Sequence, residues 1–316
     1  MGSTRWPQPD PRAGRSFSEG SPVGDRWQND LKRIGYRTLL PLLSRVAARR
    51  RGIAWLRPPL TWGPRGTEFD YLLSVLGRSS IAGQDVLLQG IGGGEESRFW
   101  LPYAPNSLIG VDFDPGRTLD DAGNTVTRNF AADLTALPFS DHVFGGVASI
   151  NTWEHVQRPR AALEETKRVV GPGGWFLATF GPLYRTVGGD HLSRLRGGLE
   201  HGYNHLILDT GDYRDFVEHM SVPGVDVIDG SPALGRLYID LDLFSHWGWR
   251  DYHRLFDEVM DLQVFTCHVD LEAVEFRDRF RAKWSLLLEK GHSEEDLLIS
   301  TLVVLGRFTD TSASHD

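Results

Sequence analysis

Short apolar runs alternate with helical patterns along the middle of the chain, and this alternation constrains the fold more than any other feature. Five runs rich in aliphatic or aromatic residues read as strands: 85–89, 107–112, 125–130, 146–150 and 175–180. Strands that alternate with helices are typical of a parallel sheet. The pattern therefore predicts an α/β fold with a doubly wound sheet.

The same rhythm returns near the end of the chain, where two more strands are expected at 262–268 and 298–308. Helical patterns accompany the strands at 67–77, from about Glu95, and at 159–170, 249–260 and 271–288. A polar turn, 293–296, precedes the last strand. Seven strands in all are predicted, with residues 66–182 forming the core of the fold and 251–316 completing it.

Residues 183–250 break this rhythm, because they are rich in glycine and contain few clear strands. The segment leaves the fifth strand on the side where doubly wound sheets bind their ligands. We therefore expect residues 183–250 to be a substrate cap, inserted over the carboxyl edge of the sheet.

The N-terminal part differs from the rest in charge. Residues 1–65 carry 13 Lys and Arg against 4 Asp and Glu, whereas residues 66–316 carry 21 against 38. We expect a mobile basic arm at 1–25 and a helical cover at 26–65, which packs on the body or docks on a partner subunit or second copy. A lipid surface is the alternative partner. Nucleic acid is not expected, because an acidic body repels phosphates.

Composition excludes several other classes. No stretch of about 18 apolar residues exists, so no membrane span is predicted. The single cysteine, Cys267, rules out an internal disulfide framework and a cysteine-based zinc site. Without an apolar signal segment at the N-terminus, a cytoplasmic location is expected.

A glycine-rich turn follows the first strand, where residues 90–94 read Gly-Ile-Gly-Gly-Gly. Glycine lacks a Cβ atom, so such a turn lets a nucleotide-like ligand approach the backbone closely. Glu95 and Glu96 come next, in the first turn of the expected helix. Their charges would repel a pyrophosphate, which disfavours NAD and ATP and favours a nucleoside cofactor without phosphates.

Two acidic residues follow the next strands. Asp112 ends the second strand 22 residues after Gly90, a spacing at which a carboxylate can accept hydrogen bonds from both ribose hydroxyls. Asp133 follows the third strand and could accept the amino hydrogen of an adenine, with Phe113 and Leu134 as apolar faces for the ring. The alternatives are a solvated turn for Asp112 and a helix or turn cap for Asp133.

The fourth strand runs into the sequence Ser149-Ile-Asn-Thr-Trp-Glu-His-Val156. Its place at the carboxyl edge makes His155 a candidate base or substrate contact, since imidazole titrates near neutrality. A structural histidine bonded to a neighbouring loop is the alternative.

Taken in order, these motifs resemble the class I S-adenosyl-L-methionine-dependent methyltransferases, especially the broad type-11 group. The resemblance also rests on Leu137-Pro138-Phe139 and on the run from Arg168 to Gly174, and it covers about residues 84–181. It implies a Rossmann-like methyltransferase fold and S-adenosylmethionine as cofactor. Carried over by position, the cofactor-binding residues are Gly90, Gly92, Gly94, Asp112, Phe113, Asp133, Leu134 and Asn151.

Two positions depart from the family pattern. An acidic residue of the family, two places before the first glycine, is Leu88 here, and the aspartate expected before the fourth strand is Gly145. These departures motivate an alternative function, a binding or scaffold protein that keeps the fold without transferring methyl groups. A nucleotide-dependent oxidoreductase is disfavoured by Glu95 and Glu96.

The cap supplies the candidates for acceptor chemistry. We expect His191 to act as the base, with His155 as second candidate, and Tyr184 and Asp190 to contact the substrate. No metal site is expected, because Gly202 and Asn204 make a helical His201–His205 pair doubtful. The predicted reaction is O-methylation of a small molecule, such as a sugar, a polysaccharide precursor or a secondary metabolite.

Overall fold

A computed structural model describes residues 67–92, 97–113, 125–194, 198–219 and 242–309. The predicted arm at 1–25, the helical cover at 26–65 and the residues Gly94, Glu95 and Glu96 lie outside this part. In the described residues, no helix is both long and apolar enough to cross a membrane.

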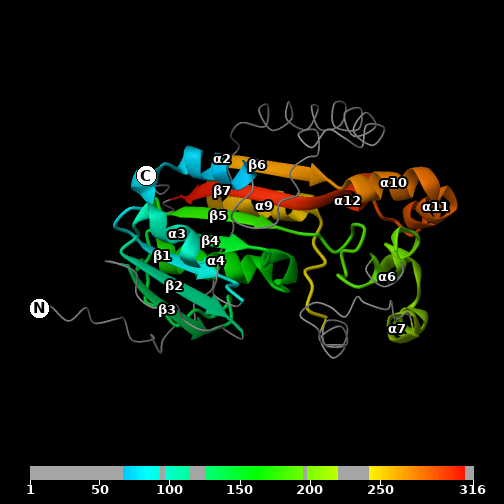
Figure 1. Ribbon diagram of the computed structural model, residues 1–316, viewed down its shortest axis with the longest axis horizontal. Helices are drawn as coiled ribbons and strands as arrows, with labels where there is room; N and C mark the ends of the chain where they lie inside the picture. Colours follow the sequence, from blue (N-terminus) through cyan, green and yellow to red (C-terminus); the bar gives the residue numbers. More distant parts are fainter. Residues whose placement is uncertain (1–66, 93–96, 114–124, 195–197, 220–241, 310–316) are drawn as a thin grey trace, which may run out of the picture.

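Seven strands form one sheet in the order β3-β2-β1-β4-β5-β7-β6 (Figure 1). The strands are β1 (Asp85–Gln89), β2 (Ser107–Asp112), β3 (Val126–Ala131), β4 (Gly146–Ile150), β5 (Trp175–Phe180), β6 (Met260–Val269) and β7 (Ile299–Phe308). Strands β1 to β5 pair in parallel, and β7 is antiparallel to both β5 and β6. The predicted doubly wound, mostly parallel seven-stranded sheet is confirmed.

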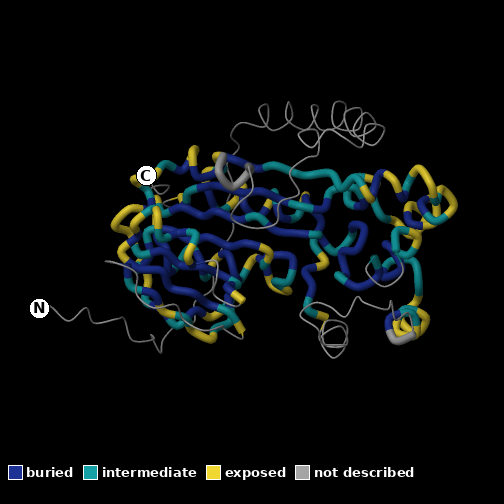
Figure 2. Tube along the Cα trace, in the orientation of Figure 1, coloured by how far each residue is buried: buried dark blue, intermediate teal, exposed yellow. Residues whose placement is uncertain are grey.

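Helices cover both faces of the sheet because its strands are apolar on both sides. Alternate residues of β1 enter different cores: Leu87 lies in the cluster beneath α4 and α9, whereas Val86 and Leu88 lie in the cluster beneath α2 and α3. The central strands are buried along their length (Figure 2). The α-helices are α2 (Thr67–Leu76), α3 (Ser97–Trp100), α4 (Pro159–Val170), α6 (Asn204–Ile207), α7 (Thr210–His219), α9 (Trp249–Val259), α10 (Leu271–Arg279), α11 (Arg281–Glu289) and α12 (Glu294–Leu298).

Two local predictions were wrong. The helix expected at 271–288 is two helices, since Phe280 adopts φ −115° and ψ 54° between α10 and α11. Its ring packs on Phe276 with centroids 5.1 Å apart, so a tertiary contact accompanies the break. The polar turn expected at 293–296 is the start of α12, where the Ser293 hydroxyl accepts the Asp296 N–H at 3.1 Å.

A helical lobe extends beyond the carboxyl ends of the parallel strands (Figure 1). It combines α10, α11 and α12 with part of the expected cap, through a third hydrophobic cluster that includes Val187, Tyr203, Phe276, Trp284 and Leu297. The Tyr203 hydroxyl also donates to the Leu297 carbonyl at 2.6 Å. Val187 and Tyr203 are thereby anchored to helices that come much later in the sequence.

Candidate functional site

The carboxyl ends of β1 to β5 meet at one edge of the sheet, which we call the carboxyl edge. The strand order reverses between β1 and β4, and such a switch point opens a crevice for ligands in doubly wound sheets. Each parallel strand is followed there by predicted site residues, in the order Gly90, Asp112, Asp133, Asn151 and Tyr184. The topology therefore gathers residues that are up to 94 positions apart at one edge.

The glycine turn after β1 needs its glycines for two different reasons. Gly90 has φ +71°, and a Cβ atom there would lie 1.8 Å from the Thr152 hydroxyl oxygen. Gly92 has φ +47°, but a Cβ atom there would meet nothing within 4 Å. Gly90 thus lets the turn pack against the end of β4, while the space beside Gly92 is open for a ligand.

Asp112 is tied to this turn, because its carboxylate accepts the Gly92 N–H at 2.9 Å. The bond holds the carboxylate at the end of β2 against the glycine backbone. Phe113, the next residue, is 74% exposed, so its ring offers an uncovered apolar face. Leu134 is buried in the hydrophobic cluster beneath α4 and α9.

Asp133 lies beside Asp112, since Asp112 pairs with Ala131 in the parallel ladder. One of its oxygens accepts the N–H and the hydroxyl of Thr135, both at 2.8 Å. The other lies 3.6 Å from the Arg158 guanidinium on the surface. Asp133 therefore stabilises its own turn, and its second oxygen meets only a loose, solvent-exposed ion pair.

Asn151 directly follows β4 and is exposed, with a left-handed φ of +51°. Asparagine tolerates this conformation better than most residues. Its N–H donates to the Thr179 carbonyl of β5 at 2.8 Å, which fixes the backbone at the centre of the carboxyl edge.

The two histidines predicted as base candidates come together in the folded chain. Their ring centroids are 4.8 Å apart, although His155 follows β4 and His191 belongs to the expected cap. The Phe244 ring packs against both, at 5.5 Å from His155 and 5.6 Å from His191. Tyr184 lies on the same aromatic ring, at 5.3 Å.

Burial keeps both imidazoles neutral. Together with a smaller contribution from nearby His155, it lowers the pKa of His191 to about 3. Burial also lowers the pKa of His155, although the Leu243 carbonyl next to Nδ1 opposes the shift. Near neutral pH, each ring can accept one hydrogen bond through its unprotonated nitrogen.

Glu154, which the sequence reasoning did not select, adjoins this pair and is 1% exposed. Burial raises the pKa of its carboxyl group to about 8. Backbone N–H groups of Glu154 and Gly181 oppose the shift more weakly, yet neither carboxylate oxygen forms a hydrogen bond within the described residues. Its position directly before His155 was the available signal, but only the fold shows that it is buried.

Asp190 is enclosed rather than open to a ligand, being 1% exposed. Its carboxylate accepts the Ser193 N–H at 3.0 Å, the Ser193 hydroxyl at 2.5 Å and the Tyr213 hydroxyl. The His205 ring lies 3.6 Å away and makes a 2.7 Å hydrogen bond to the Tyr184 carbonyl. Asp190 and His205 thus brace the cap backbone behind Tyr184.

His201, which the sequence does not favour as a metal-binding partner of His205, has contacts of its own. Its ring stacks on Phe216 with centroids 5.3 Å apart, and its Nδ1 lies 3.1 Å from the Asn204 amide nitrogen. The two histidines therefore have separate partners.

Residues 87–178 match a family described as methyltransferase domain. This region belongs to the methyltransferase domain family. The resemblance expected from the motifs is confirmed, and the glycine turn, Asp112, Asp133, Asn151 and His155 all lie within the methyltransferase domain.

One curated relative is also a methyltransferase. The chain is 36% identical over 124 residues to the demethylmenaquinone methyltransferase of Renibacterium salmoninarum, an alignment that covers 36% of this chain and 51% of the relative. The chain thus spans about half the length of this curated relative.

Solved structures with a similar chain path include an S-adenosylmethionine-dependent methyltransferase from Mesorhizobium loti, at 15% identity and a TM-score of 0.39, covering 76% of this chain and 97% of that one. Another is a geranyl diphosphate methyltransferase in complex with S-adenosylmethionine, at 13% identity and a TM-score of 0.41, covering 76% and 84%.

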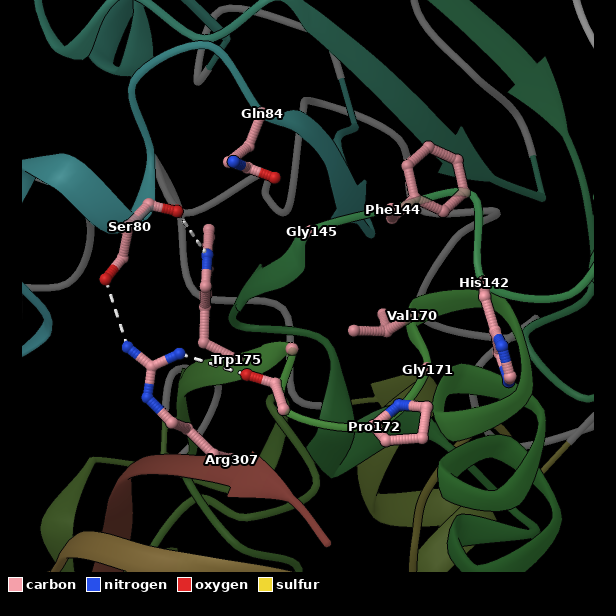
Figure 3. Close-up of a pocket in the computed structure, with 12 residues that line it drawn as sticks. Ser80, Gln84, His142, Phe144, Gly145, Val170, Gly171, Pro172, Trp175 and Arg307 are labelled. Atoms are coloured by element: carbon pink, nitrogen blue, oxygen red, sulfur yellow. Dashed lines mark hydrogen bonds between the residues drawn. The ribbon is translucent and has the colours of Figure 1, made fainter. Parts of the chain in front are cut away.

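A hollow of about 450 Å³ lies at the opposite, amino edge of the methyltransferase sheet (Figure 3). Gly145 lines it, where a Cβ atom would lie 2.4 Å from the Gln84 side chain. The Trp175 indole donates to the Ser80 carbonyl at 2.9 Å and helps form its wall. The departure at Gly145 therefore concerns packing far from the carboxyl edge, and Leu88 is buried in the core.

Proposed function

We propose that this chain binds S-adenosylmethionine at the carboxyl edge and transfers its methyl group to a hydroxyl oxygen of a small molecule. The observation that carries the proposal is the 2.9 Å bond between the Gly92 N–H and the Asp112 carboxylate, at the switch point of a sheet that matches the methyltransferase family. The bond places the Asp112 carboxylate, which can accept hydrogen bonds from hydroxyl groups, beside open glycine backbone. This arrangement suits a nucleoside with an amino-acid tail.

The cofactor-binding roles follow from position along the edge. Asp112 would accept the ribose hydroxyls, and Asp133 the adenine amino group. Phe113 and Leu134 would flank the base, which fits the exposed ring of Phe113. The methionine part would lie along Gly90, Gly92 and Gly94 beside Asn151. Leu88 replaces an acidic residue of the family and is buried in the core, whereas Gly145 lines the hollow at the amino edge.

The acceptor would lie under the cap, where His155, His191 and Tyr184 surround Phe244. S-adenosylmethionine supplies a methyl group on a sulfonium, a good leaving group, so the chain must mainly align the acceptor oxygen and exclude water. A neutral His191 imidazole can accept the hydroxyl proton in a hydrogen bond, with His155 as the second candidate. Asp190 would act behind Tyr184 rather than on the substrate itself.

Calorimetry on the full chain tests cofactor binding. Titrations with S-adenosylmethionine and S-adenosylhomocysteine should give saturable heat, and NAD should give none. An absence of heat with both sulfur nucleosides would overturn the proposal. Heat with NAD alone would point to a nucleotide-dependent oxidoreductase.

Release of S-adenosylhomocysteine tests the transfer step. Hydroxylated small molecules should support it, namely sugars, polysaccharide precursors and phenolic metabolites. Demethylmenaquinone, chosen because of the relative's name, carries no hydroxyl group and tests transfer to carbon instead. Peptides and RNA serve as negative acceptors. Cofactor binding without release across the whole panel would favour the alternative, a binding or scaffold protein.

A further inference from the structure

Three side chains at the carboxyl edge converge as metal ligands do. Glu154, His155 and His191 each offer one ligand atom, and these atoms lie within 4.8 Å of one another. Nitrogen and oxygen ligands of one zinc-sized ion lie about 3 to 4 Å apart, given bonds of about 2 Å. Small side-chain rotations would therefore bring the three atoms onto a shared ion.

Glu154 is the first reason to expect a cation. The residue is 1% exposed, and neither carboxylate oxygen forms a hydrogen bond within the described residues. Its backbone is held in place, since its carbonyl accepts the Ser245 N–H at 2.7 Å and the Trp153 carbonyl accepts the Tyr252 hydroxyl at 2.6 Å. A buried carboxyl group without a hydrogen bond is costly, and a bound cation would satisfy its oxygens.

His155 is oriented as a metal-binding histidine is. Its Nδ1 lies 2.8 Å from the Leu243 carbonyl oxygen, which can only accept, so Nδ1 carries the proton. The lone pair is then on Nε2. Histidines that bind metals usually donate their other N–H to a carbonyl or carboxylate in this way.

His191 supplies the third ligand from the cap. It has a left-handed φ of +60°, and its N–H donates to the Gly188 carbonyl at 2.9 Å in a tight turn. Gly189 fits beneath this turn, where a Cβ atom would lie 2.3 Å from the carbonyl oxygens of Leu183 and Tyr184. The turn therefore has little freedom, and it holds His191 against His155.

We propose that Glu154, His155 and His191 bind one divalent transition-metal ion, of the zinc, manganese or iron(II) class. Two imidazoles and one carboxylate suit these ions, whereas magnesium and calcium prefer oxygen ligands alone. Three protein ligands also leave coordination positions open for water or a substrate oxygen. The sequence predicts no metal site, and the doubtful His201–His205 pair is not part of this one.

Metal binding and proton acceptance by His155 and His191 are alternatives, because both use the same nitrogen lone pairs. If the proposed methyl transfer is correct, an ion at this place would bind the acceptor oxygen and make its hydroxyl more acidic. That consequence rests on the proposed function, whereas metal binding itself does not.

Cobalt(II) titration of the full chain tests the site after treatment with a chelator. Visible absorption should show one ion bound per chain, and zinc should displace it. Glu154→Gln and His191→Asn should each weaken cobalt binding at least tenfold. His142→Asn is the matched control, because His142 also has a left-handed φ, of +57°, but lies at the amino edge, so its binding should equal wild type.

A wild-type chain without saturable cobalt binding would overturn the proposal, and so would equal affinity in wild type and both site variants. Circular dichroism confirms that each variant is folded. If Glu154→Gln does not fold, the cobalt affinities of His191→Asn and His142→Asn are compared, and equal affinities would overturn the proposal. Titration of the same samples with S-adenosylhomocysteine separates the metal site from the proposed function. Cobalt binding without cofactor binding would support only the metal site, and cofactor binding without cobalt binding would support only the proposed function.

Discussion

The two edges of the same sheet use similar residues for different purposes. At the amino edge, Gly145 and Gly146 make room for the side chains of Gln84 and Trp175, and a Cβ atom at Gly146 would lie 2.0 Å from the indole. At the carboxyl edge, Gly92 leaves open space beside a backbone N–H that Asp112 accepts. A glycine-rich sequence alone does not distinguish packing from ligand binding.

The edges also differ in how their polar groups are satisfied. At the amino edge, Arg307 donates to the Gly173 carbonyl and the Ser80 hydroxyl, both at 3.0 Å (Figure 3). At the carboxyl edge, buried Glu154 has no hydrogen-bond partner within the described residues. A buried polar group without a hydrogen bond is costly, so Glu154 calls for an explanation. The following substitutions contrast the two edges.

Gly146→Ala should cause the largest loss of stability. The new methyl group would overlap the Trp175 ring, so the free energy of unfolding should fall by about 3 kcal/mol, measured by urea denaturation. Gly173→Ala is the control, because a Cβ atom there meets nothing within 4 Å and only φ +75° is unfavourable. It should cost about 1 kcal/mol. Equal losses in the two variants would contradict the packing role of Gly146.

His191→Asn should lower turnover about 100-fold while leaving cofactor affinity nearly unchanged, since asparagine tolerates φ +60° but cannot accept the proton. Single-turnover kinetics and calorimetry measure the two quantities. His142→Asn, at the other edge, should keep wild-type turnover. Normal turnover in His191→Asn would exclude His191 as base.

Asp112→Ala should weaken binding of S-adenosylhomocysteine about tenfold, or more than 1 kcal/mol, through loss of the ribose hydrogen bonds. Asp141→Ala is the control at the amino edge, where Asp141 pairs with Arg168 at 2.7 Å on the surface. Asp141→Ala should bind S-adenosylhomocysteine with wild-type affinity. If both variants bind alike, Asp112 does not hold the ribose.

His268→Gln should have the smallest effect, and only on the pH dependence of stability. Burial in β6 lowers the pKa of His268 to about 4, from an ordinary 6.5. Between these values the unfolded chain binds a proton that the native chain does not, so stability falls as the pH drops from about 6.5 to about 5.5. The substitution should remove about 1 kcal/mol of that fall, measured by denaturation at both pH values. An identical pH dependence in both chains would contradict the shift.

The sheet was predictable from sequence because each strand carries its own signal. The bounds expected for 85–89, 107–112, 146–150 and 175–180 agree with β1, β2, β4 and β5, where continuous apolar runs end at glycine or polar turns. The break at Phe280 was not predictable, since the residues around it favour helix and the ring turns toward Phe276 only in the folded lobe.

The sequence by itself determined which residues follow the parallel strands, and hence that Gly90, Asp112 and Asn151 lie at one edge, because strand direction follows from the alternation of elements. Only the tertiary structure decided that His191 meets His155 and that Glu154 is buried beside them. The physical reason is that burial and cap placement depend on contacts between distant segments, such as Tyr203 with Leu297, which no local pattern encodes.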